Sequence, residues 1–284
     1  MAILLALVAA VAYGLSDFIG GLVSRRASPW SVATVGMCAS TVCTALLAAF
    51  VTGEPTRADF AWAAFAGVGS GMGAGFLYRG LSQGRMGVVA PLSAVGAAVV
   101  PVMVGVVTGE RPGAFVWVGI VLAFPAIWLV ASTPADEDPL HCDEPRESTT
   151  AAVIDGLLAG AGFGVLFAAL GQVPDEAGLW PLTLTQAVSV PAVVVLALAL
   201  RAPWVPRGRY VWWSLGTGPL GTAATLFFLL ASQRGYLTIA GVLTSLYPAA
   251  TVLLAWLVLK ERIHRAQALG LALCAFAVAM VAAG

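Results

Sequence analysis

The sequence has few charged residues. Asp, Glu, Lys and Arg make up only 10% of its 284 residues, against about 25% in a typical soluble domain. Hydrophobic residues make up 60%, so most of the surface must contact something other than water. The formal net charge is zero, which gives no support for binding nucleic acid. We therefore expect a protein embedded in a lipid bilayer, with no nucleic-acid partner.

The residues that enzymes use are scarce as well. Both histidines, His141 and His264, lie in expected loops, and no set of His, Cys and carboxylate residues has the spacing of metal ligands. The phosphate-binding Walker sequence is also absent. We expect no catalytic residue, no metal and no cofactor.

The sequence consists of two similar hydrophobic halves. Glu110-Arg111 ends one apolar run and Gly119 opens the next, and Glu261-Arg262 and Gly270 repeat this pattern 151 residues later. Repeats of this kind in membrane proteins often frame a central substrate site. We predict repeats over residues 1–132 and 151–284, joined by an acidic polar linker over 133–150. The repeated Glu-Arg and Gly residues are expected to be structural anchors of the helices.

Ten segments are long and apolar enough to cross a membrane as α-helices, which need roughly 20 residues each. They are 2–23, 31–51, 60–81, 87–107, 114–132, 152–171, 179–200, 210–231, 237–258 and 266–283. Five spans per half is an odd number, so the two copies must insert with opposite orientation. The predicted fold is an all-α membrane protein of ten transmembrane helices, arranged as two inverted five-helix repeats.

The basic residues of the loops predict an orientation. Most of the fourteen Lys and Arg residues lie on the side of the loop between the first two spans, whereas Arg57, Arg111 and Arg234 lie on the other side. Because basic loops stay in the cytoplasm, this distribution predicts that both termini lie outside it.

A charged residue within a membrane span is costly and often functional, and we single out Asp17 and Arg79. Asp17 is in the first span and Arg79 is in the third, each near the same end of its helix. One hypothesis is a buried ion pair between them. The alternative is that each reaches the nearby interface separately. For Asp17, whose side chain is short, we favour a wet or paired environment.

Other polar and aromatic residues suggest a route through the protein. The fourth span contains Pro91, Ser93 and Pro101, and the ninth contains Tyr247 and Pro248. An interior proline frees a carbonyl and bends its helix, so these spans are the candidate gating elements. The residues expected to line the route or to couple transport are Asp17, Tyr13, Ser16, Tyr78, Arg79, Ser93, Tyr247 and Pro248. The glycines from Gly67 to Gly75 predict close helix packing, and Gln186 predicts a hydrogen bond between helices.

Tyr13-Gly14-Leu15-Ser16-Asp17-Phe18, and the run from Pro248 through Glu261-Arg262 to Gly270, resemble the EamA-type transporters of the drug/metabolite transporter superfamily. The resemblance implies helices 1–4 and 6–9 around a central cavity, with helices 5 and 10 at the periphery and both termini in the cytoplasm. It also implies secondary transport, commonly export of amino acids, metabolites or drugs. In the related small multidrug resistance proteins a carboxylate of the first helix couples protons, and Asp17 lies in the comparable helix. One departure is Ala97, which stands where the first half would repeat Pro248.

The sequence therefore predicts a transporter of the plasma (bacterial inner) membrane that moves a small organic solute by alternating access. Protons are the candidate coupling ion, and a homodimer is the candidate assembly. Two alternatives remain open. A lipid flippase predicts a lateral opening to the bilayer, whereas a non-transporting sensor or assembly subunit predicts tight packing around Asp17 and no continuous cavity.

Overall fold

The computed structural model describes residues 1–83, 86–131, 149–259 and 263–284. Ten helical spans within these residues are long and apolar enough to cross a membrane, and the ninth of them consists of two consecutive α-helices. This confirms the ten predicted spans. The helices are α1 (Ala2–Ser24), α2 (Pro29–Ala48), α3 (Arg57–Ser82), α4 (Met86–Val107), α5 (Ala114–Ala131), α6 (Thr149–Leu170), α7 (Trp180–Ala199), α8 (Thr217–Gln233), α9 (Leu237–Thr244), α10 (Tyr247–Leu254) and α11 (Arg265–Ala283). Short helical turns are η1 (Asp175–Ala177), η2 (Tyr210–Gly216) and η3 (Ala255–Leu259). The predicted linker lies almost entirely outside the described residues.

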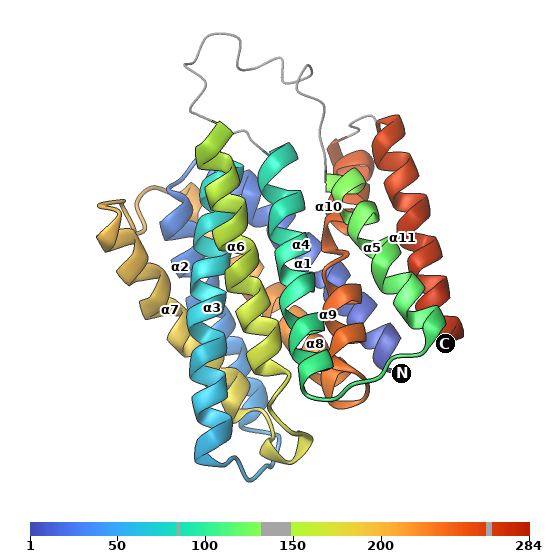
Figure 1. The fold of residues 1–284 in the computed structure, drawn as a ribbon. Coiled ribbons are helices and arrows are strands. Elements are labelled where there is room, and N and C mark those ends of the chain that lie inside the picture. The colour runs from blue at the N-terminus through green and yellow to red at the C-terminus, as the bar shows by residue number, and fades with distance from the viewer. Residues whose placement is uncertain (84–85, 132–148, 260–262) are drawn as a thin grey trace.

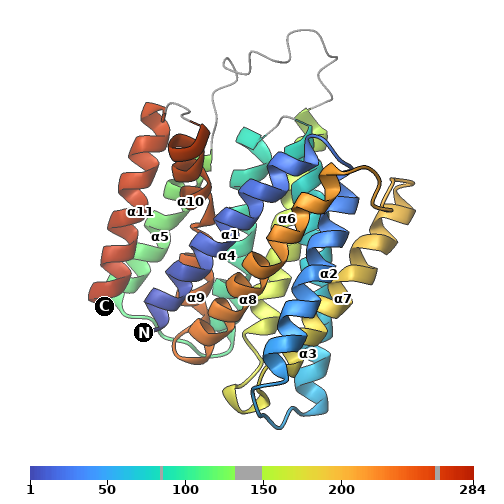
Figure 2. The same cartoon turned by 180° about the vertical axis from the view of Figure 1, so that it is seen from behind.

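Corresponding helices of the two halves run in opposite directions. α1 leads away from the end of the bundle where both termini lie, whereas α6 leads toward that end (Figure 1). Packing partners also occur in related pairs, because α3 packs against α6 as α8 packs against α1. Seen from behind, α1, α8 and α2 lie nearest the viewer, and α7 lies at the edge of the bundle (Figure 2). The predicted arrangement of two inverted five-helix repeats is confirmed.

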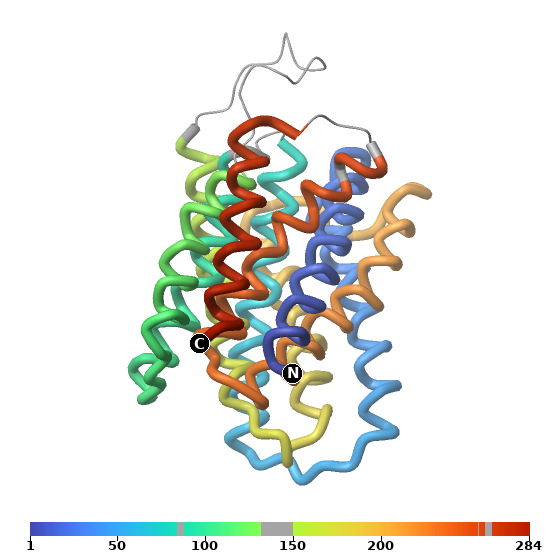
Figure 3. The backbone as a smooth tube through the Cα atoms, turned by 90° about the vertical axis from the view of Figure 1, so that its right-hand side faces the viewer, coloured from blue at the N-terminus to red at the C-terminus, as the bar shows by residue number. Residues whose placement is uncertain are grey.

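α5 and α11 form a peripheral pair at one side of the bundle, as Figures 1 and 3 show. A Cβ atom on Gly119 of α5 would lie 2.7 Å from the side chain of Val281 on α11. A Cβ atom on Gly270 of α11 would lie 2.6 Å from the backbone nitrogen of Val130 on α5. Val130 and Val281 are separated by the same 151 residues as the two glycines. The repeated glycines therefore make reciprocal contacts across the pseudo-twofold axis.

The two candidate gating spans differ in structure. α4 continues through Pro91 and Pro101. The ninth span is instead divided into two helices, because α9 ends at Thr244 and α10 begins at Tyr247. Pro248 has no N–H, so the carbonyl four residues earlier, that of Thr244, has no donor to continue the helix. The bend that the sequence predicted for both spans thus becomes a break in the ninth alone.

The glycines of α3 pack against two different neighbours. A Cβ atom on Gly67 or Gly71 would collide with α7, at the carbonyls of Thr185 and Ser189 respectively. On Gly69 or Gly73 it would collide with α6. The predicted close packing is confirmed, and it brings the first half into direct contact with both helices that face it.

Substitution of Gly119 or Gly270 by valine should weaken the packing of α5 against α11, because the added side chain would overlap neighbouring atoms. Overpacking costs about 1–3 kcal/mol, so we expect a lower melting temperature of the detergent-solubilised protein for each variant. Gly113→Val is the matched control, since no heavy atom lies within 4 Å of a Cβ atom placed there. Equal melting temperatures for all three variants would contradict the reciprocal contact.

Candidate functional site

A cavity of about 60 Å³ lies between the two repeats. Its walls come from α1, α2 and α3 of the first half and from α6, α7 and α8 of the second. Most of its lining residues are buried, and the cavity is partly open to the outside of the protein. The polar residues that line it are Tyr13, Ser16, Asp17, Ser40, Ser70, Tyr78, Gln186, Thr217 and Thr225.

Asp17 is the only acidic or basic residue among the described residues that line this cavity. It is 9% exposed and lies near Tyr13, Tyr78 and Tyr247. Tyr78 and Ser16 both line the same cavity. The ring of Tyr78 occupies the space that a side chain at Gly20 would fill, because a Cβ atom there would meet the ring. Four of the predicted route residues therefore converge here: Tyr13, Ser16, Asp17 and Tyr78.

The hydroxyl group of Tyr13 is buried without a hydrogen-bond partner among the described residues. Tyr13 is 8% exposed, and its ring packs edge-on against Phe167 with ring centroids 5.6 Å apart. A buried polar group without a partner costs about 1–3 kcal/mol. An unpaired hydroxyl beside a carboxylate in a cavity is therefore a place where a bound molecule would be stabilised.

A network of amide and hydroxyl groups closes one wall of the cavity. The Gln186 side-chain nitrogen donates to the hydroxyl of Ser40 (2.7 Å) and to that of Thr225 (3.2 Å). The Ser40 hydroxyl also lies 2.9 Å from that of Thr222. These bonds join α7, α2 and α8, which confirms the prediction of an interhelical bond at Gln186.

Four predicted route residues lie outside this lining: Arg79, which is described below, and Ser93, Tyr247 and Pro248. The hydroxyl of Tyr247 is 2.9 Å from the Ser93 hydroxyl, which joins α10 to α4. The ring of Tyr247 packs against the rings of Tyr13 (6.3 Å between centroids) and Phe163 (6.5 Å). Ser93, Tyr247 and the buried Pro248 thus form a layer behind the cavity wall. The walls come from helices 1–3 and 6–8, whereas the family resemblance implied helices 1–4 and 6–9.

The hypothesis that Asp17 pairs with Arg79 is wrong. The Arg79 Nε atom lies 3.2 Å from Oδ2 of Asp155 on α6, and the Asp155 side chain is fully buried. Equal depth in the membrane does not determine which face of a helix meets which neighbour, and α3 packs far more extensively against α6 than against α1.

Asp155 is a site residue that sequence reasoning missed. It carries the same signal as Asp17, a carboxylate in an apolar run. Its position within one turn of the expected start of the sixth span at residue 152, beside the acidic linker, made it resemble a boundary charge. Because α6 begins at Thr149, Asp155 lies almost two turns inside the helix.

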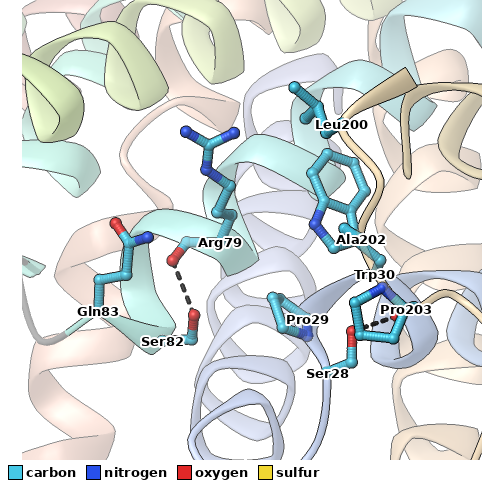
Figure 4. A pocket seen from close by; sticks show the side chains of 9 residues that line it. All are labelled: Ser28, Pro29, Trp30, Arg79, Ser82, Gln83, Leu200, Ala202 and Pro203. Atoms are coloured by element: carbon cyan, nitrogen blue, oxygen red, sulfur yellow. Dashed lines mark hydrogen bonds between the residues drawn. The ribbon is translucent and has the colours of Figure 1, made fainter. Parts of the chain in front are cut away.

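Arg79 also borders a second, outer cavity of about 410 Å³ at the end of the bundle opposite the termini. Figure 4 shows Arg79 and Gln83 of α3 on one side and Trp30 of α2 with Leu200 on the other. Trp30 is almost fully buried and packs edge-on against Phe76. Both cavities take lining residues from α2 and α3, and the outer one lies nearer the end of each helix. We call the outer cavity the vestibule.

Gly80-Leu81-Ser82-Gln83-Gly84, beside the vestibule, has the Gly-x-Ser-x-Gly spacing of a hydrolase nucleophile elbow. Such an elbow needs a strand-to-helix turn, whereas Ser82 is the last residue of α3. Its hydroxyl donates to the carbonyl of Arg79 at 2.8 Å. Nor do His, Cys, Asp and Glu gather in a metal-binding group within the described part of the chain.

Glu110 connects the two halves near the end of the bundle where the termini lie. Its carboxylate accepts hydrogen bonds from the backbone N–H groups of Leu237 and Thr238, the latter at 2.9 Å. These are the first residues of α9, whose N–H groups have no partner within the helix. Arg111 donates to the carbonyl of Val106 in the last turn of α4 (3.3 Å). The corresponding residues of the second half, Glu261 and Arg262, lie outside the described residues.

Two inverted five-helix repeats with a polar cavity between them define a polytopic membrane protein of the transporter type. The chain belongs to the EamA-like transporter family, whose model matches residues 1–132 and 150–283. A solved structure titled "Crystal structure of protein" is 15% identical, with a TM-score of 0.71, and the match covers 98% of this chain and 95% of that one. At this identity the likeness supports the fold alone. No curated protein matches the sequence significantly.

Removal of Arg79 from the Arg79–Asp155 pair should destabilise the protein more than removal of the Asp155 charge. Arg79→Gln leaves a fully buried carboxylate without this cation and should lower stability by about 3 kcal/mol. Asp155→Asn should cost less, because the partly exposed Arg79 side chain can turn into the vestibule. We expect the double variant to recover most of the loss in thermal denaturation. Simple additivity of the two single losses would rule out the pairing.

Glu110→Ala should destabilise the contact between α4 and α9. Loss of a helix N-terminal cap typically costs about 0.5–2 kcal/mol, so we expect a modest decrease in melting temperature. Glu54→Ala removes an exposed carboxylate from a loop and serves as the control. An equal effect of both substitutions would show that the decrease reflects lost charge and not the lost cap.

Proposed function

We propose that this protein is a secondary transporter of the plasma membrane that exports a small organic solute by alternating access. The observation that carries the proposal is the buried carboxylate of Asp17 in a polar cavity at the boundary between two inverted repeats. Polar and ionisable residues within the membrane usually mark a substrate or ion pathway. Substrate sites of inverted-repeat transporters lie at such a boundary. The direction of transport is taken from the family resemblance alone.

The difference between the two ends of the bundle supports alternating access. At one end the vestibule extends between α2, α3 and the segment after α7, to within about a turn of the residues that line the central cavity. Near the other end, Glu110 ties α4 to the start of α9. Separation of α4 from α9 at this end would require these bonds to break, and the interruption between α9 and α10 provides a place for the ninth span to bend.

The cavity around Asp17 also bears on the two rival functions. A sensor or assembly subunit would pack tightly around Asp17, whereas a cavity lies beside this residue. A lipid flippase would need a path from the cavity to the bilayer. The polar lining of the cavity, with one carboxylate and several hydroxyl groups, favours a water-soluble solute over a lipid.

Asp17 is the candidate residue for proton coupling in this proposal. We expect Asp17→Asn to abolish solute-dependent proton movement while the protein still inserts, because an amide cannot take up and release a proton near neutral pH. The measurement is the fluorescence of a pH indicator trapped in proteoliposomes, with amines, amino acids and nucleosides supplied outside as candidate solutes.

The matched control is Asp175→Asn, which changes an exposed carboxylate in the loop after α6 in the same way. It should move protons like the wild type. Wild-type proton movement by Asp17→Asn would remove Asp17 from the coupling mechanism.

A further inference from the structure

The central cavity has a charge imbalance that bears on the kind of solute. Among its described lining residues there is one carboxylate, Asp17, and no Arg, Lys or His. We propose that the solute is a small organic cation, an amine or a methylated ammonium compound, whose charged group lies beside Asp17 among the tyrosine side chains. This inference rests on the proposed transport function and names its substrate class.

An anionic solute would find no counter-ion in this cavity. The basic residue nearest to it along the chain is Arg79, next to the cavity residue Tyr78. Its guanidinium group is held by Asp155 at 3.2 Å and borders the vestibule, not the cavity. A carboxylate or phosphate group would therefore meet Asp17 as a like charge in a poorly hydrated site, where such repulsion is strong. A cation would meet an opposite charge instead.

The aromatic lining favours a cation for a second reason. Tyr13, Tyr78 and Phe163 line the cavity, and Tyr247 packs against two of these rings from behind. Aromatic rings attract ammonium groups through their quadrupoles, and groups of such rings recognise methylated ammonium ions. The carboxylate and the rings thus select the same kind of ligand.

The hydroxyl group of Tyr13 provides a further observation at the same place. It is buried, it belongs to the cavity lining, and no described residue forms a hydrogen bond with it. A protonated amine carries several N–H donors and could satisfy this oxygen and the Asp17 carboxylate together. The cavity of about 60 Å³ has room for a few groups the size of a water molecule. This matches the charged head of a small amine.

The test is ligand-dependent thermal stabilisation of the purified, detergent-solubilised protein. The probes are n-propylammonium, 1-propanol and propionate, which share a propyl or similar chain but differ in charge, together with tetramethylammonium. We expect saturable stabilisation by the two cations at constant ionic strength, and little or none by the alcohol or the carboxylate. Equal or greater stabilisation by propionate or propanol, or no stabilisation by either cation, would overturn the proposal.

Three variants localise the binding site. Asp17→Asn should weaken binding of n-propylammonium at least tenfold, because it removes the counter-ion. Tyr13→Phe keeps the ring but removes the unpaired hydroxyl, and should weaken binding about tenfold. It also tests the site if Asp17→Asn does not insert. Asp175→Asn should bind as the wild type does. Wild-type affinity in both cavity variants would place the amine elsewhere and defeat the proposal.

Failure of this inference can be told apart from failure of the proposed function. Binding of cations that depends on Asp17, without any solute-dependent proton movement, would support the ligand class and refute proton-coupled transport. Proton movement that depends on Asp17 and is elicited only by anionic or neutral solutes would support transport and refute the cation site.

Discussion

Every polar group that this chain carries into the bilayer must find its partner within the protein, because hydrocarbon offers none. The hydroxyl groups of Thr34 and Thr44 donate to the carbonyls of Trp30 and Ser40, one turn earlier in α2. Arg79 meets Asp155 on the neighbouring helix. The same requirement explains why some polar residues bond within their own helix and others, such as Gln186 and Tyr247, bond to the opposite half. It also explains why an unpartnered hydroxyl at the central cavity is informative.

Some repeated residues make equivalent contacts in both halves, whereas other positions differ between the halves. Gly119 and Gly270 make reciprocal contacts that hold α5 against α11 at the periphery. Neither helix contributes a residue to the lining of the central cavity. Pro248 has Ala97 in place of its counterpart, and α4 is continuous where the ninth span is interrupted between α9 and α10. This departure from the repeat therefore occurs in the layer behind the cavity wall, where Tyr247 and Ser93 join the two halves. Glu110 belongs to the repeated Glu-Arg sequence, but it accepts a hydrogen bond from the interrupted ninth span.

The helices, the repeat and the close packing of the α3 glycines could be predicted from the sequence, because each depends on local composition and spacing. The ion pair could not. Hydropathy places Asp17 and Arg79 at similar depth, but the choice between α1 and α6 as the neighbour of Arg79 depends on how α3 is rotated and packed. Tyr247 was expected to line the route for the same reason and lies one layer behind it. Depth follows from sequence, whereas rotation about a helix axis follows from the whole bundle.

Asp17 and Asp155, two carboxylates in the described membrane-spanning helices, differ in a way that explains why Asp17 is suited to function. Asp155 is neutralised by a residue of the same chain, so its charge stabilises the contact between α3 and α6 and is not available to a solute. Asp17 faces a cavity whose described lining offers hydroxyls and aromatic rings but no cation. A charge that the protein itself leaves uncompensated must be compensated by something that enters, a proton or a positively charged solute. Because Asp17 is buried, an ionised carboxylate without a bound cation or proton would be unfavourable in free energy. The charge of Asp17 is therefore linked to whether the site is occupied.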